Sequence, residues 1–246
     1  MERTGAGDPT RVLPLLWQKG GRVGRSGVTL EKVVEAAIGL ADEVGVGQLT
    51  IRKVASKLGV GAMTLYSYVP GRAELIDLMV DKTFAEVTYP DAPTSWREGM
   101  VEVADRNWDL LARHPWLVDV DSTRPPLGPG VIAKYDAELR PLVDTGLRDV
   151  EIDQVLTLVL AHVWSSARQN AAAGWGEAPR GGDEEWWQQA GPLLATVMAP
   201  ERYPHAARIG EAAGQAYGST VDPARAYAFG LHTILDGIEA LIERRT

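Results

Sequence analysis

The segment LTIRKVASKLGVGAMTLYSYV, residues 49–69, constrains the fold more than any other part of the chain. Its apolar residues follow the i, i+3, i+4, i+7 spacing of a helix that buries one face; they are Ile51, Val54, Ala55 and Leu58. Thr50 stands at the N-cap position, and Gly59 can adopt the left-handed conformation that ends a helix. A second short helix follows at once. The pattern predicts either a helix-turn-helix or two ordinary helices of an all-α domain.

Three motifs carry a family resemblance. They are TIRKVASKLGV from Thr50, TLYSYV from Thr64, and the basic residue Arg72 after a short turn. Together they resemble the DNA-binding domain of TetR-family transcriptional regulators, and TLEKVVEAAIGLADEVG, residues 29–45, resembles its first helix. The resemblance implies an all-α protein with an N-terminal three-helix domain that contains the helix-turn-helix. A larger helical domain for effector binding and dimerisation would follow it, with domain limits at 26–72 and 73–246.

Eight side chains of this unit are predicted to contact double-stranded DNA: Thr50, Arg52, Lys53, Met63, Thr64, Tyr66, Tyr68 and Arg72. Arg52 is the best candidate for base reading, because arginine can pair with both O6 and N7 of guanine. Thr50 and the free N–H groups beside it suit a phosphate. Tyr66 and Tyr68 are expected to donate to phosphates and Arg72 to hold another, as the resemblance implies. Lys53 is expected to contact the backbone or solvent.

The second helix begins with residues that offer few hydrogen bonds. Gly61 and Ala62 stand where polar residues are often found in the family, so Met63 or Thr64 is left to contact a thymine methyl group. We therefore expect Arg52 to carry much of the specificity.

Charge is distributed unevenly along the chain. The formal net charge is −8, yet residues 1–72 hold ten Lys and Arg against six Asp and Glu, which gives +4, and the remainder carries −12. A basic N-terminal third can face phosphates while the acidic remainder points away. Residues 1–25 are glycine-rich and basic and are predicted to be a flexible arm, either a disordered tail or a minor-groove arm. The apolar LPLLW, residues 13–17, is instead expected to dock on the protein.

Beyond residue 73 the periodicity predicts helices over roughly 73–87, 95–113, 130–145, 150–173, 183–198, 205–217 and 223–244. The last helix carries one broad apolar stripe, and FGLHTILDGIEALI, residues 229–242, resembles the dimerisation helix of the tetracycline-repressor subgroup. STRPPL, residues 122–127, resembles its central loop. The resemblance implies a homodimer that reads a palindromic operator with two recognition helices about 34–36 Å apart. A small-molecule effector would release the DNA.

Eight tryptophans in 246 residues indicate either a packed core or an aromatic cavity for a planar or polycyclic ligand. The candidate effector contacts are Trp108, Trp116, Tyr135, Glu138, His162 and Asn170. Val120 occupies the position of the histidine that anchors magnesium in tetracycline repressors, so a tetracycline–magnesium complex is not expected. We expect neither a metal nor a cofactor, because the four histidines lack metal-ligand spacing.

Two rival functions have less support. A constitutive DNA-binding regulator without a ligand would share every motif above. An all-α enzyme is disfavoured, because no serine or cysteine lies in a nucleophile motif and no glycine loop suits a phosphate. The chain has no cysteine and no signal-like N-terminus, and its longest apolar stretch, residues 155–164, is too short to span a bilayer. A cytoplasmic protein with no membrane partner is therefore predicted.

Overall fold

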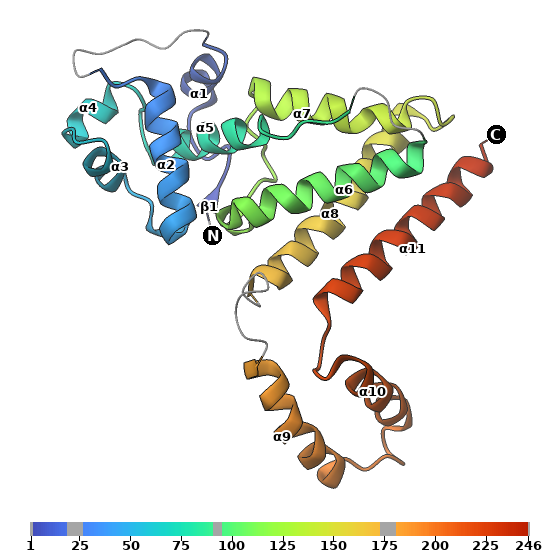
Figure 1. Ribbon diagram of the computed structural model, residues 1–246. Coiled ribbons are helices and arrows are strands. Elements are labelled where there is room, and N and C mark those ends of the chain that lie inside the picture. The colour runs from blue at the N-terminus through green and yellow to red at the C-terminus, as the bar shows by residue number, and fades with distance from the viewer. Residues whose placement is uncertain (1, 19–26, 91–94, 173–180, 246) are drawn as a thin grey trace.

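The computed structural model describes residues 2–18, 27–90, 95–172 and 181–245 (Figure 1). These residues form eleven α-helices, three 3-10 helices and two strands of two residues each. The predicted all-α class is confirmed. Within the described ranges, no helix is both long and apolar enough to cross a membrane.

The N-terminal domain contains α2 (Leu30–Val44), α3 (Ile51–Lys57) and α4 (Ala62–Tyr66), with the 3-10 helix η1 (Val46–Gln48) between the first two. The predicted cap at Thr50 is confirmed, because its hydroxyl accepts from the backbone N–H of Lys53 at 3.2 Å. The hydroxyl of Thr29 caps α2 in the same way, accepting from the backbone N–H of Lys32 at 3.2 Å. Gly59 has φ +68°, the left-handed conformation expected at this turn. Local capping chemistry therefore sets the limits of these helices.

Helix α5 (Arg72–Phe84) leads from this domain into the body of the protein. Every residue from Glu74 to Asp81 is buried, because α5 is packed against α1, α2 and α7. A carboxylate oxygen of Asp81 accepts from the backbone N–H of Val131, 2.9 Å away, in the first turn of α7 (Pro129–Leu139). Gly130 lies so close to the backbone carbonyl of Asp81 that a Cβ would overlap it. The two helices thus meet at their backbones.

The body is built around α6 (Trp96–Arg113), α8 (Asp149–Ala172) and α11 (Pro223–Glu243), with α7 beside α5 and α8 (Figure 1). Two 3-10 helices, η2 (Pro115–Asp119) after α6 and η3 (Arg140–Leu142) after α7, both pack against α6. Fully buried side chains form its core; they include Met100, Leu110, Leu142, Leu156 and Val159. These helices agree closely with the predicted ranges.

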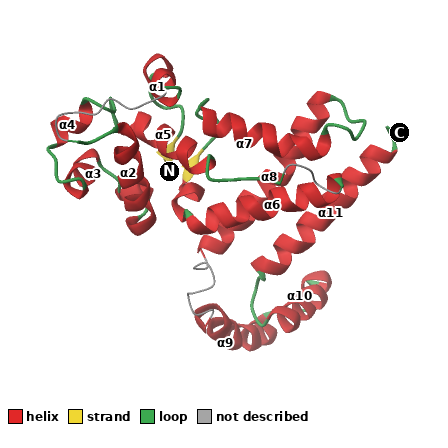
Figure 2. Cartoon of the chain, turned by 45° about the horizontal axis from the view of Figure 1, so that its top comes forward, coloured by secondary structure: helices red, strands yellow, loops and turns green. Residues whose placement is uncertain are grey.

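Helices α9 (Gly181–Val197) and α10 (Pro204–Tyr217) form a hairpin that extends away from the body (Figures 1 and 2). Trp187 of α9 packs against α10 at Gly214, where a Cβ would lie only 2.7 Å from the indole ring. The hairpin leaves large apolar side chains exposed, including Leu193 at 66% and Val197 at 80%.

The predicted flexible arm is wrong for residues 2–18. Strand β1 (Glu2–Arg3) pairs in parallel with β2 (Val120–Asp121), and α1 (Pro9–Leu16) packs on α5. The LPLLW segment docks as expected: Leu16 is buried, and the indole N–H of Trp17 donates to the carbonyl of Leu127 at 2.8 Å. Burial of these apolar side chains explains why residues 2–18 adopt a defined structure although they include Gly5 and Gly7. Residues 19–25 of the proposed arm lie outside the described residues.

Candidate DNA interface and effector site

The first turn of α3 presents two cations to solvent. Arg52 and Lys53 are exposed, whereas their neighbours Ile51 and Val54 are buried against the domain core. The ammonium of Lys53 donates to the side-chain oxygen of Gln48 at 3.3 Å. Arg52 therefore extends from a helix that its neighbours hold in place, a rigid support for base reading.

The recognition helix α4 is short and sharply two-sided. Leu65 is 0% exposed, whereas Met63 is 80% and Tyr66 50% exposed. Thr64 is half-buried. The N-cap residue, Gly61, supplies no side-chain hydrogen bond. The exposed surface thus offers one phenol, one thioether and few hydrogen-bonding groups, as the sequence predicts.

Two of the residues predicted to contact phosphates bond within the protein. The hydroxyl of Tyr68 donates to the backbone carbonyl of Val28 at 3.0 Å, so its proton is engaged inside the domain. Arg72 donates to the carbonyl of Leu49 at 2.7 Å and that of Val46 at 2.8 Å, and a further nitrogen pairs with Glu2. Both side chains therefore stabilise the domain in this structure, and their contacts with phosphate stay predictions.

Two of the predicted effector residues meet at Tyr227 of α11. The ring centroid of Trp108 lies 4.5 Å from that of Tyr227, and the imidazole of His162 stacks nearly parallel to the same ring at 5.6 Å. The Nε2 atom of His162 is also 2.9 Å from the Tyr227 carbonyl oxygen. Gly230 leaves room for the imidazole, because a Cβ there would overlap it. This aromatic cluster, Trp108, His162 and Tyr227, joins α6, α8 and α11.

Glu138 is the centre of a buried polar cluster. Its Oε1 accepts from the ammonium of Lys134 at 2.5 Å, from the amide of Asn107 at 2.6 Å and from the hydroxyl of Tyr89 at 2.7 Å. Burial lowers the pKa of Lys134, and burial together with the Glu138 charge raises that of Tyr89. The ammonium also lies 5.0 Å from the ring centroid of Phe84. Such a cluster can recognise a polar group of a ligand.

Trp116 lines a different cavity, of about 390 Å³, between the end of α2, η2 and the end of α8. Its indole N–H is buried and has no hydrogen-bond partner among the described residues. Arg168 lines the same cavity and donates twice to the carbonyl of Val118, at 2.7 and 3.1 Å.

The six predicted effector residues do not share one location. Tyr135 is 41% exposed, and its hydroxyl donates to Asp153 at 2.8 Å, so its placement in a core pocket needs correction. The reason is that α7 turns Lys134 and Glu138 inward, which leaves Tyr135 on the outer face. Asn170 is half-buried near the end of α8.

Sequence reasoning missed several polar residues that the fold brings to these sites: Tyr89, Asn107, Lys134, Arg168 and Tyr227. The i, i+4 spacing of Lys134 and Glu138 was the one available signal. Among the described residues, no group of three His, Cys, Asp or Glu side chains could hold a metal ion.

Comparison with known proteins supports the resemblance. Residues 89–242 match the family model described as tetracyclin repressor-like, C-terminal domain. The chain is 37% identical over 99% of its length to the HTH-type transcriptional repressor DrrR1 of Streptomyces coeruleorubidus, covering 90% of that protein. It is 28% identical to the tetracycline repressor protein class A from transposon 1721 of Escherichia coli, covering 84% of this chain and 88% of that one.

Solved structures agree on the fold. Apo ActR from Streptomyces coelicolor aligns with a TM-score of 0.73 at 24% identity, over 89% of this chain and 98% of that one. ActR in complex with (S)-DNPA aligns with a TM-score of 0.69 at 25% identity, over 87% and 98% of the two chains. The capped helix-turn-helix, the helical body and these matches lead to one conclusion: the chain belongs to the TetR family of helix-turn-helix transcriptional regulators.

Proposed function

We propose that this protein represses transcription as a homodimer on a palindromic operator and is released by a small planar aromatic molecule. The observation that carries the proposal is the pair α3 and α4, whose inner faces are buried while Arg52, Met63 and Tyr66 face solvent. One such unit contacts too little DNA for tight specific binding, so two copies are needed to read successive major grooves.

The outer face of α8 and α11 supports dimerisation. Val150 and Leu158 on α8 and Phe229 on α11 are 74%, 50% and 73% exposed. Between the helices runs a groove of about 370 Å³ whose lining includes Ile234 and Leu241. Apolar surface of this kind gains about 25 cal/mol for each Å² that a partner covers. A second copy, related by a twofold axis, would bury the same face of both protomers.

The aromatic cluster supports a small-molecule effector. Trp108, His162 and Tyr227 bring three flat rings together where α6, α8 and α11 meet, and the buried Glu138 cluster lies on α6 and α7. ActR, which shares the fold, has been solved with actinorhodin and with (S)-DNPA. A ligand releases the DNA only if it binds the released conformation more tightly than the DNA-bound one.

Gel shift and fluorescence anisotropy test operator binding and its release by a ligand, and light scattering tests dimerisation. The DNA is the duplex that the wild-type protein selects from a random library, and the probe ligand is actinorhodin. We expect a palindromic selected sequence, a solution mass twice 26.6 kDa, and at least tenfold weaker DNA binding with ligand. A monomeric mass would refute the dimer, and a binding constant unmoved by actinorhodin and a panel of planar aromatics would favour the constitutive regulator.

A further inference from the structure

We propose that residues Glu2–Gly5, here called the strap, position the helix-turn-helix on the body, and that Arg72 is the positioning residue through which the strap acts on DNA reading. The inference rests on the proposed reading of an operator by two units. It follows from the contacts that the strap makes with both domains, because a four-residue segment joins β2 of the body to the loop ahead of α3.

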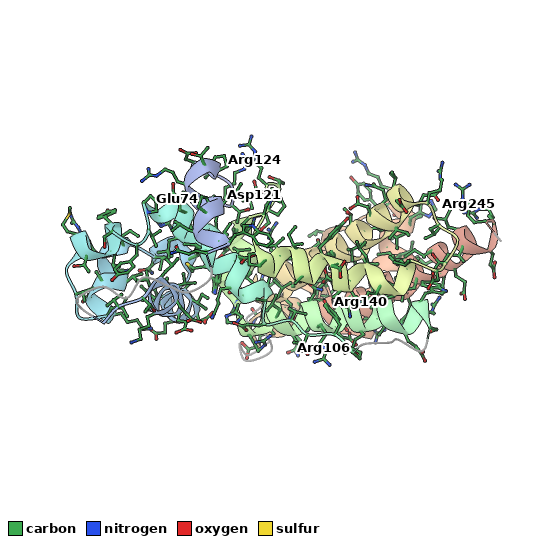
Figure 3. All side chains as sticks on the ribbon, turned by 90° about the horizontal axis from the view of Figure 1, so that it is seen from above. Glu74, Arg106, Asp121, Arg124, Arg140 and Arg245 are labelled. Atoms are coloured by element: carbon green, nitrogen blue, oxygen red, sulfur yellow. The ribbon has the colours of Figure 1, made fainter. Side chains whose placement is uncertain are left out.

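On the body side the strap is held by its backbone. It pairs with Val120 and Asp121 as a parallel strand, and the backbone N–H of Thr4 donates to the carbonyl of Asp121 at 3.0 Å. Thr4 is 0% exposed, and its hydroxyl donates to the carbonyl of Arg124 at 2.8 Å. Asp121 and Arg124, both labelled in Figure 3, belong to the segment that leads from β2 toward α7. Backbone bonds of this kind fix the register of the strap on the body.

The strap then turns onto α5. Gly5 has φ +62°, and a Cβ there would lie 2.8 Å from the Cβ of Arg124, so both conformation and space favour glycine. Its backbone N–H donates to a carboxylate oxygen of Asp77 at 2.8 Å. Asp77 belongs to the buried face of α5, so the strap is joined to the helix that connects the two domains.

On the DNA-binding side the strap acts through one side chain. The carboxylate of Glu2 pairs with Arg72, whose remaining nitrogens donate to the carbonyls of Val46 and Leu49. Leu49 directly precedes Thr50, the N-cap of α3, and Arg52 lies in the first turn of that helix. The guanidinium fork therefore links the strap to the start of the helix that carries the base-reading arginine.

The strap also connects to the part of the body that lines the cavity containing Trp116. Its partner β2 directly follows η2, which contains Trp116 and borders the cavity between α2 and α8. A displacement of η2 and β2 would move the strap, because the two are paired, and would shift Arg72 with it. The strap thus adds a connection between the body and the reading unit to those made by α5 and by the contacts of η2 with η1 and α2.

Glu2→Gln tests the proposal, with Arg3→Gln as its matched control. Both substitutions remove one charge from the same two-residue strand, but Arg3 pairs with Asp121 of the body, at 3.6 Å, and not with Arg72. Affinity is measured for the duplex selected by wild-type protein and for an unrelated duplex. Because the Glu2–Arg72 pair is partly exposed, we expect E2Q to weaken selected-duplex binding about three- to tenfold and unrelated-duplex binding less than twofold.

A distance measurement separates positioning from stability. The chain has no cysteine, so Ser56→Cys on the exposed face of α3 takes a single spin label. We expect E2Q to broaden the distance distribution between the two labels of a dimer, and R3Q to leave it unchanged. Unaltered affinity and distances in E2Q, or losses in R3Q as large as in E2Q, would overturn the proposal. If the wild-type label gives no distance, the dimer fails, and the affinity comparison still decides the role of the strap.

Discussion

The turn at Gly59 offers the sharpest test of how the DNA-binding unit is built. Gly59 and Gly61 lie two residues apart, and an added Cβ would meet no atom within 4 Å at either position. They differ in backbone conformation: Gly59 has φ +68°, whereas Gly61 has φ −72° and ψ 145°, an extended conformation that any residue adopts. Replacing each by alanine therefore isolates the cost of the left-handed conformation from any clash.

The expected magnitude follows from two opposing effects. Alanine in the left-handed region costs about 1–2 kcal/mol. Replacing glycine also restricts the unfolded chain, which returns about 0.4–1 kcal/mol. We expect Gly59→Ala to lower the free energy of unfolding by roughly 0.5–1.5 kcal/mol, and Gly59→Asn by less, because asparagine tolerates this conformation. At about 2–4 °C per kcal/mol for a chain of this size, the loss is measurable as a fall in melting temperature.

The assay is thermal and urea unfolding followed by circular dichroism. Gly61→Ala is the control, and we expect its stability to stay within about 0.5 kcal/mol of wild type, because restriction of the unfolded chain offsets the loss of glycine's preference for the N-cap position. Equal destabilisation by Gly59→Ala and Gly61→Ala would refute the reasoning, since steric space is open at both and the left-handed φ is found only at Gly59.

Three further predictions concern DNA contacts and pH. Arg52→Ala should cost about 1–3 kcal/mol at one base position of the selected duplex and relax specificity there, whereas Lys53→Ala should weaken all duplexes alike. Tyr66→Phe should reduce DNA affinity without changing the free energy of unfolding. Tyr68→Phe should lower the free energy of unfolding by about 1 kcal/mol, because its hydrogen bond to the Val28 carbonyl is lost, and should leave the salt dependence of DNA binding unchanged. Burial raises the pKa of Asp77 above its ordinary 3.8, so the folded state binds its proton more tightly and loses stability as pH rises through that pKa. Asp77→Asn should therefore raise the melting temperature at pH 7, and its advantage over wild type should shrink toward pH 4; a pH-independent difference would contradict the burial of a charge.

Local signals in the sequence were sufficient for the helices of the DNA-binding unit. The hydroxyls of Thr29 and Thr50 accept from a backbone N–H group three positions away, and Gly59 ends its helix in the left-handed conformation. These effects depend only on neighbouring residues, so the sequence shows them directly. The apolar stripes of the body likewise predicted α6, α8 and α11, because the 3.6-residue period survives in any buried helix.

Contacts between distant segments could not be predicted in the same way. Arg72 bonds to carbonyls more than twenty positions away, and Tyr68 to one that is forty positions away. Every residue has a backbone carbonyl, so the sequence does not show which carbonyl a side chain will bond. Arg72 and Tyr68 could therefore be interpreted only as polar side chains suited to a phosphate. The strand pair between Glu2–Arg3 and Val120–Asp121 is also too short to leave a period-2 pattern.

The contact between Gly130 and the carbonyl of Asp81 has a geometric consequence for the DNA-binding unit. Because the two backbones touch at this crossing, there is no side chain between them that could shift to let α5 slide against α7. Arg72 lies at the opposite end of the helix, roughly 13 Å away at ~1.5 Å per residue. If α5 tilted about this crossing, its Arg72 end would be displaced most, and the loop ahead of α3, to which Arg72 bonds, would move with it.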